Sequence, residues 1–211
     1  MKIGAFVPQG WRMDLNGVAQ DKQWQTILEA AKKIEKLNYE SLWVYDHFHT
    51  VPKPTQDPTY ECWTLMSALS QTTTNVRLGQ MCTCNSYRNP ELLADMARTV
   101  DHISDGRGVL GIGSGWFEQD YEEYGYEFGT AIWRLKELEK SLERIVKRMG
   151  KLDPQPKRKI PILIGGGGEK VTLRLVAQYA DIWHGFATKT EERSGIETVA
   201  HKNSVLNNWC S

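Results

Sequence analysis

Short, continuously apolar runs alternate along the chain with longer runs in which apolar residues recur every three or four positions. A short run that is apolar throughout is typical of a strand buried on both faces, and the longer spacing is typical of an amphipathic helix. The pattern predicts strands over residues 3–7, 41–45, 76–81, 109–112, 162–164 and 182–185. It predicts helices between and after them over residues 22–37, 62–73, 91–104, 131–149, 170–179 and 198–209.

This alternation of strands and helices predicts an α/β fold in which helices cover a parallel sheet. No G-x-G-x-x-G follows the first strand, so the dinucleotide fingerprint of an open doubly wound sheet is absent. The glycine-rich motifs follow the fourth and fifth strands, which favours a TIM-type (β/α) barrel with its site at the carboxyl ends of the strands. A closed barrel has eight βα units and we count six. We therefore expect an incomplete barrel, with residues 1–211 forming a single domain.

The composition is that of an ordinary globular chain, with 211 residues, 40% hydrophobic and 25% charged. A formal net charge of zero gives no electrostatic reason to expect binding to nucleic acid or to an anionic membrane. No apolar run approaches the roughly 18–20 residues that cross a bilayer, and the first residues resemble a strand more than a signal peptide. The four cysteines follow no disulfide or zinc spacing, so we expect reduced thiols and a cytoplasmic protein.

Four consecutive glycines follow the buried strand predicted at residues 162–164 and precede a predicted helix. A glycine turn at this place directs backbone N–H groups at an anion, and the helix adds its positive N-terminal end. We therefore predict that Gly165, Gly166, Gly167 and Gly168 cradle the phosphate of a phosphorylated ligand. The alternative is a tight strand-to-helix turn without a ligand.

Asp46 and His47 follow the second predicted strand, at the lip of a barrel, where polar side chains usually face a ligand. Because a histidine titrates near neutral pH, it exchanges protons readily with a reacting group. We select both as candidate catalytic residues. The alternative is a structural pair that closes the loop. His49 lies two residues further on, but Asp-His-x-His by itself is only a weak indication of a metal site.

Small residues follow the next two predicted strands. The segment that contains Met81 and Cys82 turns from apolar to small and polar residues, as expected of a loop beside a flat ligand; the alternative is an ordinary connection to a helix. After the fourth strand, three alternating glycines (111, 113 and 115) leave room for a planar group, and we select Gly113 and Ser114 there as candidate cofactor-binding residues. Trp116 can supply an apolar wall.

Two further groups of residues near the predicted site are expected to have structural roles without a ligand. Trp183 and His184 follow one another on a strand, so only one of them faces inward, and we expect a packed tryptophan and a surface histidine. The acidic side chains after the fourth strand are expected to form a solvated face: Glu118, Asp120, Glu122 and Glu123.

Taken together, these motifs resemble the luciferase-like monooxygenase family, in particular its branch of coenzyme F420-dependent oxidoreductases. The matching segments occur in the order found in that family. They are KIGAFVPQ (2–9), ESLWVYDHF (40–48), VRLG (76–79), RNP (88–90), ISDGR (103–107), LGIGSGW (110–116) and ILIGGGG (162–168).

The resemblance implies a (β/α)8 barrel that holds F420, or FMN as the alternative, and transfers a hydride to or from a small organic substrate. Asp46 and His47 match residues beside the cofactor ring, and Met81 and Cys82 fall where the family often has a non-prolyl cis peptide. Gly113 and Ser114 belong to the implied cofactor site, and the glycines 165–168 match the phosphate-binding turn.

The sequence departs from the family pattern at two places. Trp116 stands where sugar-phosphate dehydrogenases of the family have a catalytic glutamate, which disfavours that substrate class. The long insertion before the fifth strand and the last two βα units have no counterpart, so an unpaired sheet edge is expected. We therefore predict a homo-oligomer, such as a dimer, that covers this edge.

Two alternatives to a redox enzyme remain open. The first is a non-catalytic flavin-binding or oligomerising paralogue with a degenerate barrel, which the missing units favour. The second is a metal-dependent barrel hydrolase that uses His47, His49 and His184, although the paired ligand motifs of such enzymes are not found in the sequence.

Overall fold

The structure, a computed structural model, describes residues 2–211. The strands are β1 (Gly4–Phe6), β2 (Ser41–Val44), β3 (Arg77–Gln80), β4 (Thr83–Cys84), β5 (Gly108–Gly113), β6 (Ile162–Gly165) and β7 (Ile182–His184). The helices are α1 (Gln20–Lys36), α2 (Cys62–Thr72), the 3-10 helix η1 (Asn85–Tyr87), α3 (Pro90–Ile103), α4 (Glu118–Tyr124), α5 (Ala131–Met149), α6 (Thr172–Tyr179) and α7 (Gly195–Cys210).

All twelve predicted elements are present, and local hydrogen bonds explain where some of them begin or end. β2 ends before Tyr45 because the N–H of Tyr45 donates to the side-chain oxygen of Gln9 at 2.7 Å. α7 begins three residues earlier than predicted because Ser194 and Glu197 form a capping box at its N-terminus. The short elements β4, η1 and α4 were not predicted, since each is too short to show a periodic pattern.

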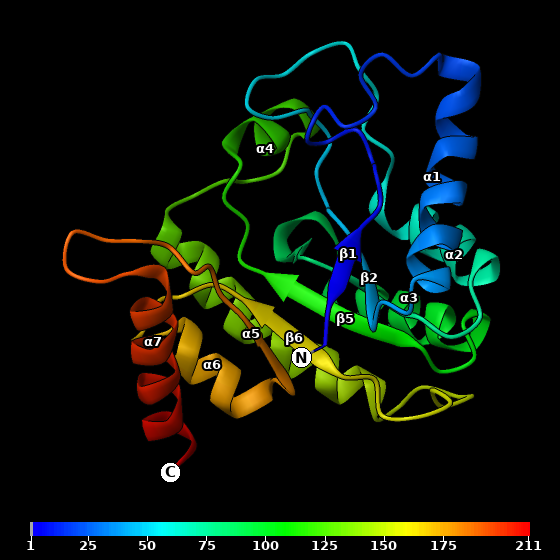
Figure 1. Cartoon of the computed structure of the whole chain (residues 1–211). Helices are drawn as coiled ribbons and strands as arrows, with labels where there is room; N and C mark the ends of the chain where they lie inside the picture. Colours follow the sequence, from blue (N-terminus) through cyan, green and yellow to red (C-terminus); the bar gives the residue numbers. More distant parts are fainter. Residues whose placement is uncertain (1) are drawn as a thin grey trace.

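The strands form one curled parallel sheet in the order β1-β2-β3-β5-β6-β7, with β4 paired to β5 (Figure 1). Leu42 of β2 lies opposite Ala5 of β1 and Leu78 of β3. Paired residues of these neighbouring strands therefore point their side chains to the same face of the sheet. Six strands of this kind make a half-barrel, which confirms the prediction of an incomplete TIM-type barrel. Among the described residues, β1 and β7 form its two edges.

The two faces of the sheet carry different cores. Side chains such as Leu42 and Leu78 point outward and are fully buried beneath the helices. Trp43, Val109 and Leu163 point to the concave face and form a separate, smaller cluster. Because both faces are buried, the strands have continuous apolar runs rather than an alternating pattern.

Trp43 fills much of the concave side of the sheet. A Cβ added at Gly4 would lie 2.5 Å from Nε1 of Trp43, and one added at Gly79 would lie 2.4 Å from its Cζ3 atom. Two neighbouring strands therefore carry glycine where the indole ring crosses them. The indole N–H donates to Oγ of Ser41 at 2.8 Å, which satisfies the one polar group of the ring.

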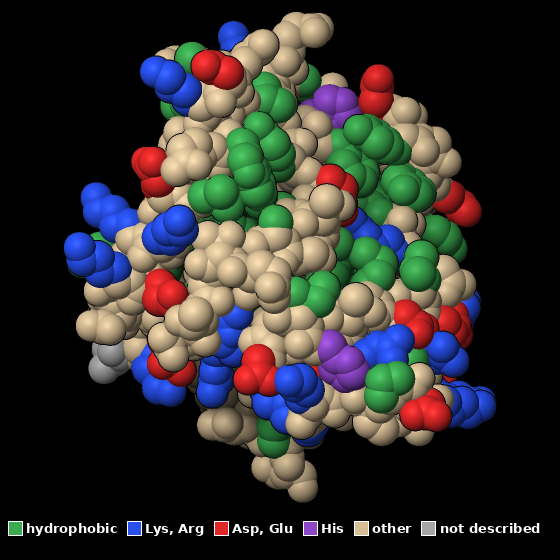
Figure 2. Space-filling view, turned by 90° about the vertical axis from the view of Figure 1, so that its right-hand side faces the viewer, with side chains coloured by type: hydrophobic (Ala, Val, Ile, Leu, Met, Phe, Trp, Pro, Cys, Tyr) green, Lys and Arg blue, Asp and Glu red, His purple; other side chains and the backbone are tan. Residues whose placement is uncertain are grey.

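The loops at the carboxyl ends of the strands, with α4, form the upper part of the molecule in Figure 1, and α5, α6 and α7 lie at the lower left. On the face seen in Figure 2, hydrophobic side chains gather in the upper half and charged side chains in the lower half. Within residues 2–211, no helix combines the length and the apolar character that a membrane crossing requires.

Candidate active site

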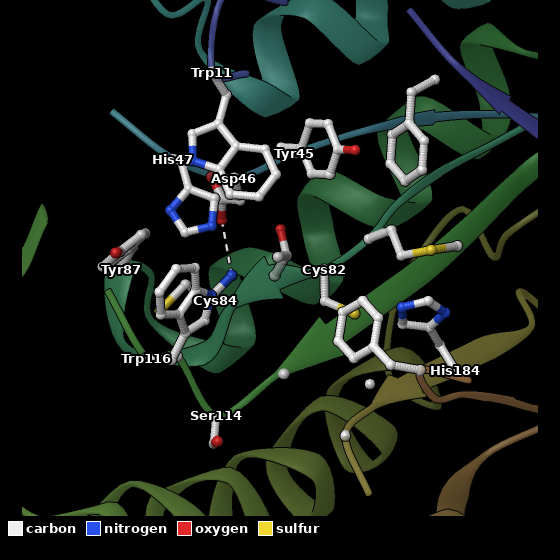
Figure 3. A pocket seen from close by; sticks show the side chains of 18 of the residues that line it. Trp11, Tyr45, Asp46, His47, Cys82, Cys84, Tyr87, Ser114, Trp116 and His184 are labelled. Carbon is white, nitrogen blue, oxygen red and sulfur yellow. Dashed lines mark hydrogen bonds between the residues drawn. The ribbon is translucent and has the colours of Figure 1, made fainter. Parts of the chain in front are cut away.

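A cavity of about 550 Å³ opens at the carboxyl ends of the parallel strands (Figure 3). Its walls come from the segments that follow β1, β2, β3, β5, β6 and β7, so every βα unit of the half-barrel contributes. The lining residues are Phe6, Trp11, Arg12, Tyr45, Asp46, His47, Met81, Cys82, Thr83, Cys84, Tyr87, Gly113, Ser114, Gly115, Trp116, Gly165, Gly166, His184 and Phe186.

One wall of the cavity is a stack of aromatic rings. The imidazole of His47 lies parallel to the indole of Trp11, with ring centroids 4.5 Å apart and planes 7° apart. Trp11 also contacts Tyr45 at 4.1 Å, and Tyr45 stacks on Phe6 at 4.2 Å. Trp116 presents an edge to His47 at 5.7 Å, as the expected apolar wall. Such a surface favours a flat, apolar or aromatic ligand.

The opposite part of the cavity is lined by Cys82 and by glycines that lie against it. A Cβ added at Gly165 would lie 2.5 Å from the sulfur of Cys82, and one at Gly113 would lie 3.5 Å from its Cβ. The peptide bond between Met81 and Cys82 is cis, as the family resemblance implied. Burial raises the pKa of the Cys82 thiol to about 12, so the thiol stays protonated at neutral pH.

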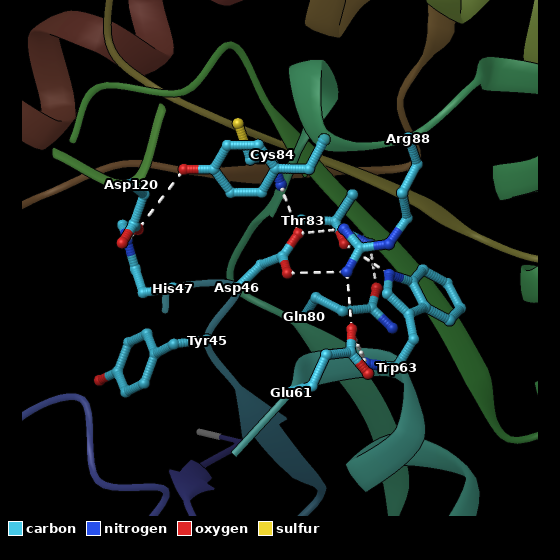
Figure 4. Close-up of polar contacts among 12 residues, drawn as sticks. Tyr45, Asp46, His47, Glu61, Trp63, Gln80, Thr83, Cys84, Arg88 and Asp120 are labelled. Atoms are coloured by element: carbon cyan, nitrogen blue, oxygen red, sulfur yellow. Dashed lines mark hydrogen bonds and ion pairs between the residues drawn. The ribbon is translucent and has the colours of Figure 1, made fainter. Parts of the chain in front are cut away.

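Asp46 is the buried centre of an ion-pair network beside the cavity (Figure 4). Arg88 donates to both of its carboxylate oxygens, at 2.6 and 3.0 Å, and the backbone N–H of Cys84 donates to it at 2.9 Å. Arg88 also donates to Glu61 at 2.7 Å. Although burial alone would lower the pKa of Arg88, the charge of Asp46 outweighs it and raises this pKa above the usual value. The network ties β2 to β4 and α2.

Asp120 occupies a second buried carboxylate site, which corrects the expectation of a solvated acidic face. Glu118, Glu122 and Glu123 are exposed, but the side chain of Asp120 is fully buried. It accepts hydrogen bonds from Nδ1 of His47 at 2.8 Å and from Nδ1 of His49 at 2.6 Å.

The hydrogen bonds from these partners stabilise the ionised form of the Asp120 carboxylate. Burial alone would raise its pKa, but the hydrogen bonds from His47 and His49 outweigh burial, so the pKa lies below its usual value. Asp120 is therefore ionised at neutral pH and holds the candidate catalytic histidine in place.

His184 lies across the cavity from His47 in Figure 3 and also lines it, so it is not the surface histidine that was expected. Burial lowers its pKa, which favours the neutral imidazole near pH 7. Trp183 points to the other side of the strand and donates through Nε1 to the carbonyl of Gly166 at 2.8 Å. The alternation of the two residues thus agrees with the strand geometry.

The glycine run divides into two parts. Gly165 and Gly166 line the cavity, and the N–H of Gly166 donates to the carbonyl of His184 at 2.9 Å. Gly167 and Gly168 are exposed outside it, and their N–H groups have no hydrogen-bond partner within residues 2–211. α6 begins at Thr172, two residues later than predicted. The N–H groups available to an anion are therefore at the outer end of the glycine run.

The three histidines considered as metal ligands are not gathered at one point. His47 and His49 both direct Nδ1 at Asp120, and His184 lies on the far side of the cavity. In the part of the chain that the structure describes, no group of three or more His, Cys, Asp or Glu side chains could hold a metal ion.

Several residues of the site were not found from the sequence. Trp11 and Tyr45 form the aromatic wall, but the first lies in an irregular loop and the second was assigned to a strand. Asp120 was assigned to an exposed acidic face. Arg88 was noted only as part of a motif, although the RNP segment that starts the third helix could have drawn attention to a buried arginine opposite Asp46. The long segment between β1 and α1 was the available signal for Trp11, because loops at this end of a barrel carry the site.

The comparison of the sequence with known proteins agrees with the geometry. The family model described as luciferase-like monooxygenase matches residues 1–202. The pyrimidine monooxygenase RutA of Rhizobium rhizogenes is 27% identical over 204 residues, which cover 86% of this chain and 56% of that protein. The F420-dependent glucose-6-phosphate dehydrogenase of Amycolatopsis mediterranei is 28% identical over 173 residues, which cover 73% and 50%. The chain thus spans about half the length of these relatives.

Solved structures with the same fold come from both cofactor classes. An F420-dependent secondary alcohol dehydrogenase in complex with an F420-acetone adduct superposes with a TM-score of 0.73 at 20% identity, over 98% of this chain and 64% of that one. The oxygenating constituent of 3,6-diketocamphane monooxygenase of Pseudomonas putida, in complex with FMN, gives 0.76 at 15% identity, over 100% and 62%. These likenesses show the fold, and the match over residues 1–202 shows the family. The chain belongs to the luciferase-like monooxygenase family.

Proposed function

We propose that this chain carries the ring-binding site of a flavin- or deazaflavin-dependent oxidoreductase or monooxygenase that acts on a small organic substrate. The observation that supports it is the cavity itself. A stacked aromatic wall and a side lined by Gly113, Gly165 and Gly166 enclose the cavity, at the end of the barrel where such sites are found. Coenzyme F420 is our first choice of cofactor and FMN is the alternative.

The residues present fit such a cofactor at both of its ends. Gly113 and Gly165 make room for the Cys82 side chain that lines the cavity, because a larger residue at Gly165 would meet the Cys82 sulfur. Gly167 and Gly168 present N–H groups without partners ahead of α6, which suits a phosphate. When bound, the cofactor would supply hydride transfer, or reaction with oxygen in the case of FMN.

The proposal gives Asp46 and His47 different roles. Asp46 lies beside the slot, but its carboxylate is held by Arg88 and by the N–H of Cys84, so it acts by fixing the wall of the site. His47 faces the cavity, and its Nε2 has no hydrogen-bond partner among the described residues. His47 is therefore the group that binds the cofactor or substrate directly and exchanges a proton with it.

The cofactor preference rests on the sequence motifs, and the relatives include both types. Trp116 occupies the loop after β5 as an exposed aromatic residue, where a sugar-phosphate dehydrogenase of this family would have its catalytic glutamate. The aromatic wall and Trp116 together favour an apolar or aromatic substrate over a sugar phosphate.

A fluorescence titration of the 211-residue chain with F420 and, in parallel, with FMN tests the proposal. We expect micromolar or tighter binding of one of them, weakened by His47→Ala and by Gly166→Asp. Gly150→Asp, at the end of α5, is the matched control for an added carboxylate and should bind as the wild type does. Binding of neither cofactor by the wild-type chain, or full affinity in both site variants, would contradict the proposal.

The open edges of the half-barrel support a second, competing proposal. A non-catalytic flavin-binding or oligomerising relative would bind cofactor tightly and show no hydride transfer to any of a panel of alcohols and aldehydes.

Because β1 and β7 have no further strand partner within residues 2–211, we also propose a homo-oligomer, such as a dimer, that covers an edge. Sedimentation velocity that shows a monodisperse monomer would contradict the oligomer.

A further inference from the structure

The carboxylate of Asp120 is surrounded only by hydrogen-bond donors. One oxygen, Oδ1, accepts from Nδ1 of His49 at 2.6 Å and from the backbone N–H groups of Phe48 and His49 at 3.2 and 3.1 Å. The other, Oδ2, accepts from Nδ1 of His47 at 2.8 Å and from the hydroxyl of Tyr87 at 3.4 Å. A single buried side chain from α4 therefore serves two histidines, one with each oxygen.

An ionised carboxylate can only accept hydrogen bonds, so each imidazole nitrogen that faces it must carry a proton. We infer that Asp120 is a positioning residue that fixes His47 in the tautomer with the proton on Nδ1 and directs a bare Nε2 to the cavity. The same carboxylate fixes His49 in the same tautomer, because Nδ1 of His49 contacts the other oxygen.

Aromatic contacts hold the plane of the His47 ring, and the hydrogen bond to Asp120 selects which side of the ring faces the carboxylate. The ring is stacked on Trp11, with planes 7° apart, and is met by the edges of Trp116 and Phe117 at 5.7 and 5.6 Å. A ring turned over would place a carbon atom against Oδ2 of Asp120 and leave that oxygen with only the hydroxyl of Tyr87 as a donor, at 3.4 Å. The tautomer is therefore set by the fold and does not depend on a ligand.

The chemical consequence of this tautomer rests on the proposed function. A neutral His47 with a bare Nε2 accepts a hydrogen bond, and then a proton, from an O–H or N–H group of a ligand. The negative charge of Asp120 stabilises the imidazolium that results. His49 and Tyr87 share Asp120 with His47. The other ionisable groups that line the cavity are Arg12, Tyr45, Asp46, Cys82, Cys84 and His184.

Replacement of Asp120 by asparagine gives a sharp test, because the two oxygens differ in their donors. The position of Oδ1 faces three N–H donors, two of them in the backbone, so the amide oxygen must take this place. The amide NH₂ then faces Nδ1 of His47 as a donor. Asp120→Asn should therefore reverse the tautomer of His47, placing its proton on Nε2, and leave His49 unchanged.

The experiment is a ¹H–¹⁵N multiple-bond correlation spectrum of the histidine rings, recorded above the pH at which they protonate. Such spectra distinguish protonated from bare ring nitrogens, and His47→Gln identifies the resonances of His47. We expect wild-type His47 and His49 to carry the proton on Nδ1, and His47 alone to switch in Asp120→Asn. Tyr87→Phe, which removes the weakest donor and keeps the carboxylate, is the matched control and should keep the wild-type tautomer.

Each outcome decides the inference without any cofactor. Wild-type His47 with its proton on Nε2, or an Asp120→Asn variant that folds and keeps the wild-type tautomer, would overturn it. If Asp120→Asn fails to fold, as circular dichroism would show, the wild-type and Tyr87→Phe spectra still decide. Failure of the proposed function would appear separately, as a wild-type chain with the expected tautomer that binds neither F420 nor FMN.

Discussion

Replacing Arg88 by methionine should destabilise the chain strongly, because it leaves Asp46 as a buried charge without its partner. The Asp46 side chain is completely buried, and Arg88 is 10% exposed. The substitution removes two of the three hydrogen bonds to the carboxylate and leaves only the N–H of Cys84. Breaking a buried pair in this way costs about 3–5 kcal/mol. The contact of Arg88 with the half-exposed Glu61 adds little to this value.

The size of the effect can be assigned to the stranded charge by a double-mutant cycle. Asp46→Asn combined with Arg88→Met removes both charges, and an asparagine oxygen can still accept from the N–H of Cys84. We therefore expect the double variant to be more stable than Arg88→Met alone, with a coupling free energy of about 2–3 kcal/mol.

The assay is urea-induced unfolding at pH 7, monitored by tryptophan fluorescence and by circular dichroism on the same samples. Coinciding transitions justify a two-state free energy for each of the four proteins. A loss below about 1 kcal/mol for Arg88→Met, or a double variant less stable than both single variants, would refute the reasoning that the pair holds a buried charge. Lys140→Met, which removes an exposed ion pair with Glu137, is the matched surface control and should change stability by less than about 1 kcal/mol.

Three further predictions concern the cavity and the sheet. Gly165→Ala should lower cofactor affinity about tenfold or more, because the added methyl group would crowd the Cys82 side chain that lines the cavity, and such overpacking costs about 1–3 kcal/mol. Gly167→Ala, in the exposed part of the glycine run, should lower the affinity less in the same titration. Burial lowers the pKa of His184, so its contribution to stability is complete above the unfolded pKa of about 6.5 and decreases as the pH falls below it. His184→Asn should therefore make the loss of stability between pH 7 and pH 5 smaller in urea titrations, and an unchanged or steeper loss would contradict this. Trp43→Ala should cost about 3–5 kcal/mol in the same unfolding assay, and a loss below about 1 kcal/mol would show that the indole does not fill the concave side.

The sheet and its covering helices could be predicted because local patterns carry them. The apolar runs of the parallel strands are short and bounded by polar residues, and α1, α3 and α5 have a clear apolar stripe. Asp46, His47 and the glycines could be placed near one another for the same reason, since the carboxyl ends of successive parallel strands meet at one edge. What local patterns do not contain is the direction of each side chain within its loop.

Asp120 shows why part of the site could not be predicted. It stands among exposed glutamates in a helix of seven residues, and nothing in the local pattern distinguishes it from them. Its burial comes from contacts with His47 and His49, more than seventy residues earlier in the chain. Trp11 is a similar case, because it stacks on a histidine 36 residues later in the chain, and no periodicity links the two.

The way in which the half-barrel is packed explains how a complete cavity can form on six parallel strands. In a closed barrel, inward side chains from all strands fill the interior together. Here Trp43 spreads across Gly4 and Gly79, and its ring packs with Val109 and Leu163, so one large side chain fills space between strands that are not all adjacent. The outer core forms between successive βα units and needs no closing strand. Met81 and Cys82, which line the cavity, pack against the cluster around Trp43. Their packing does not depend on whether anything covers the edges at β1 and β7, so cofactor binding and edge covering should be separable properties of this chain.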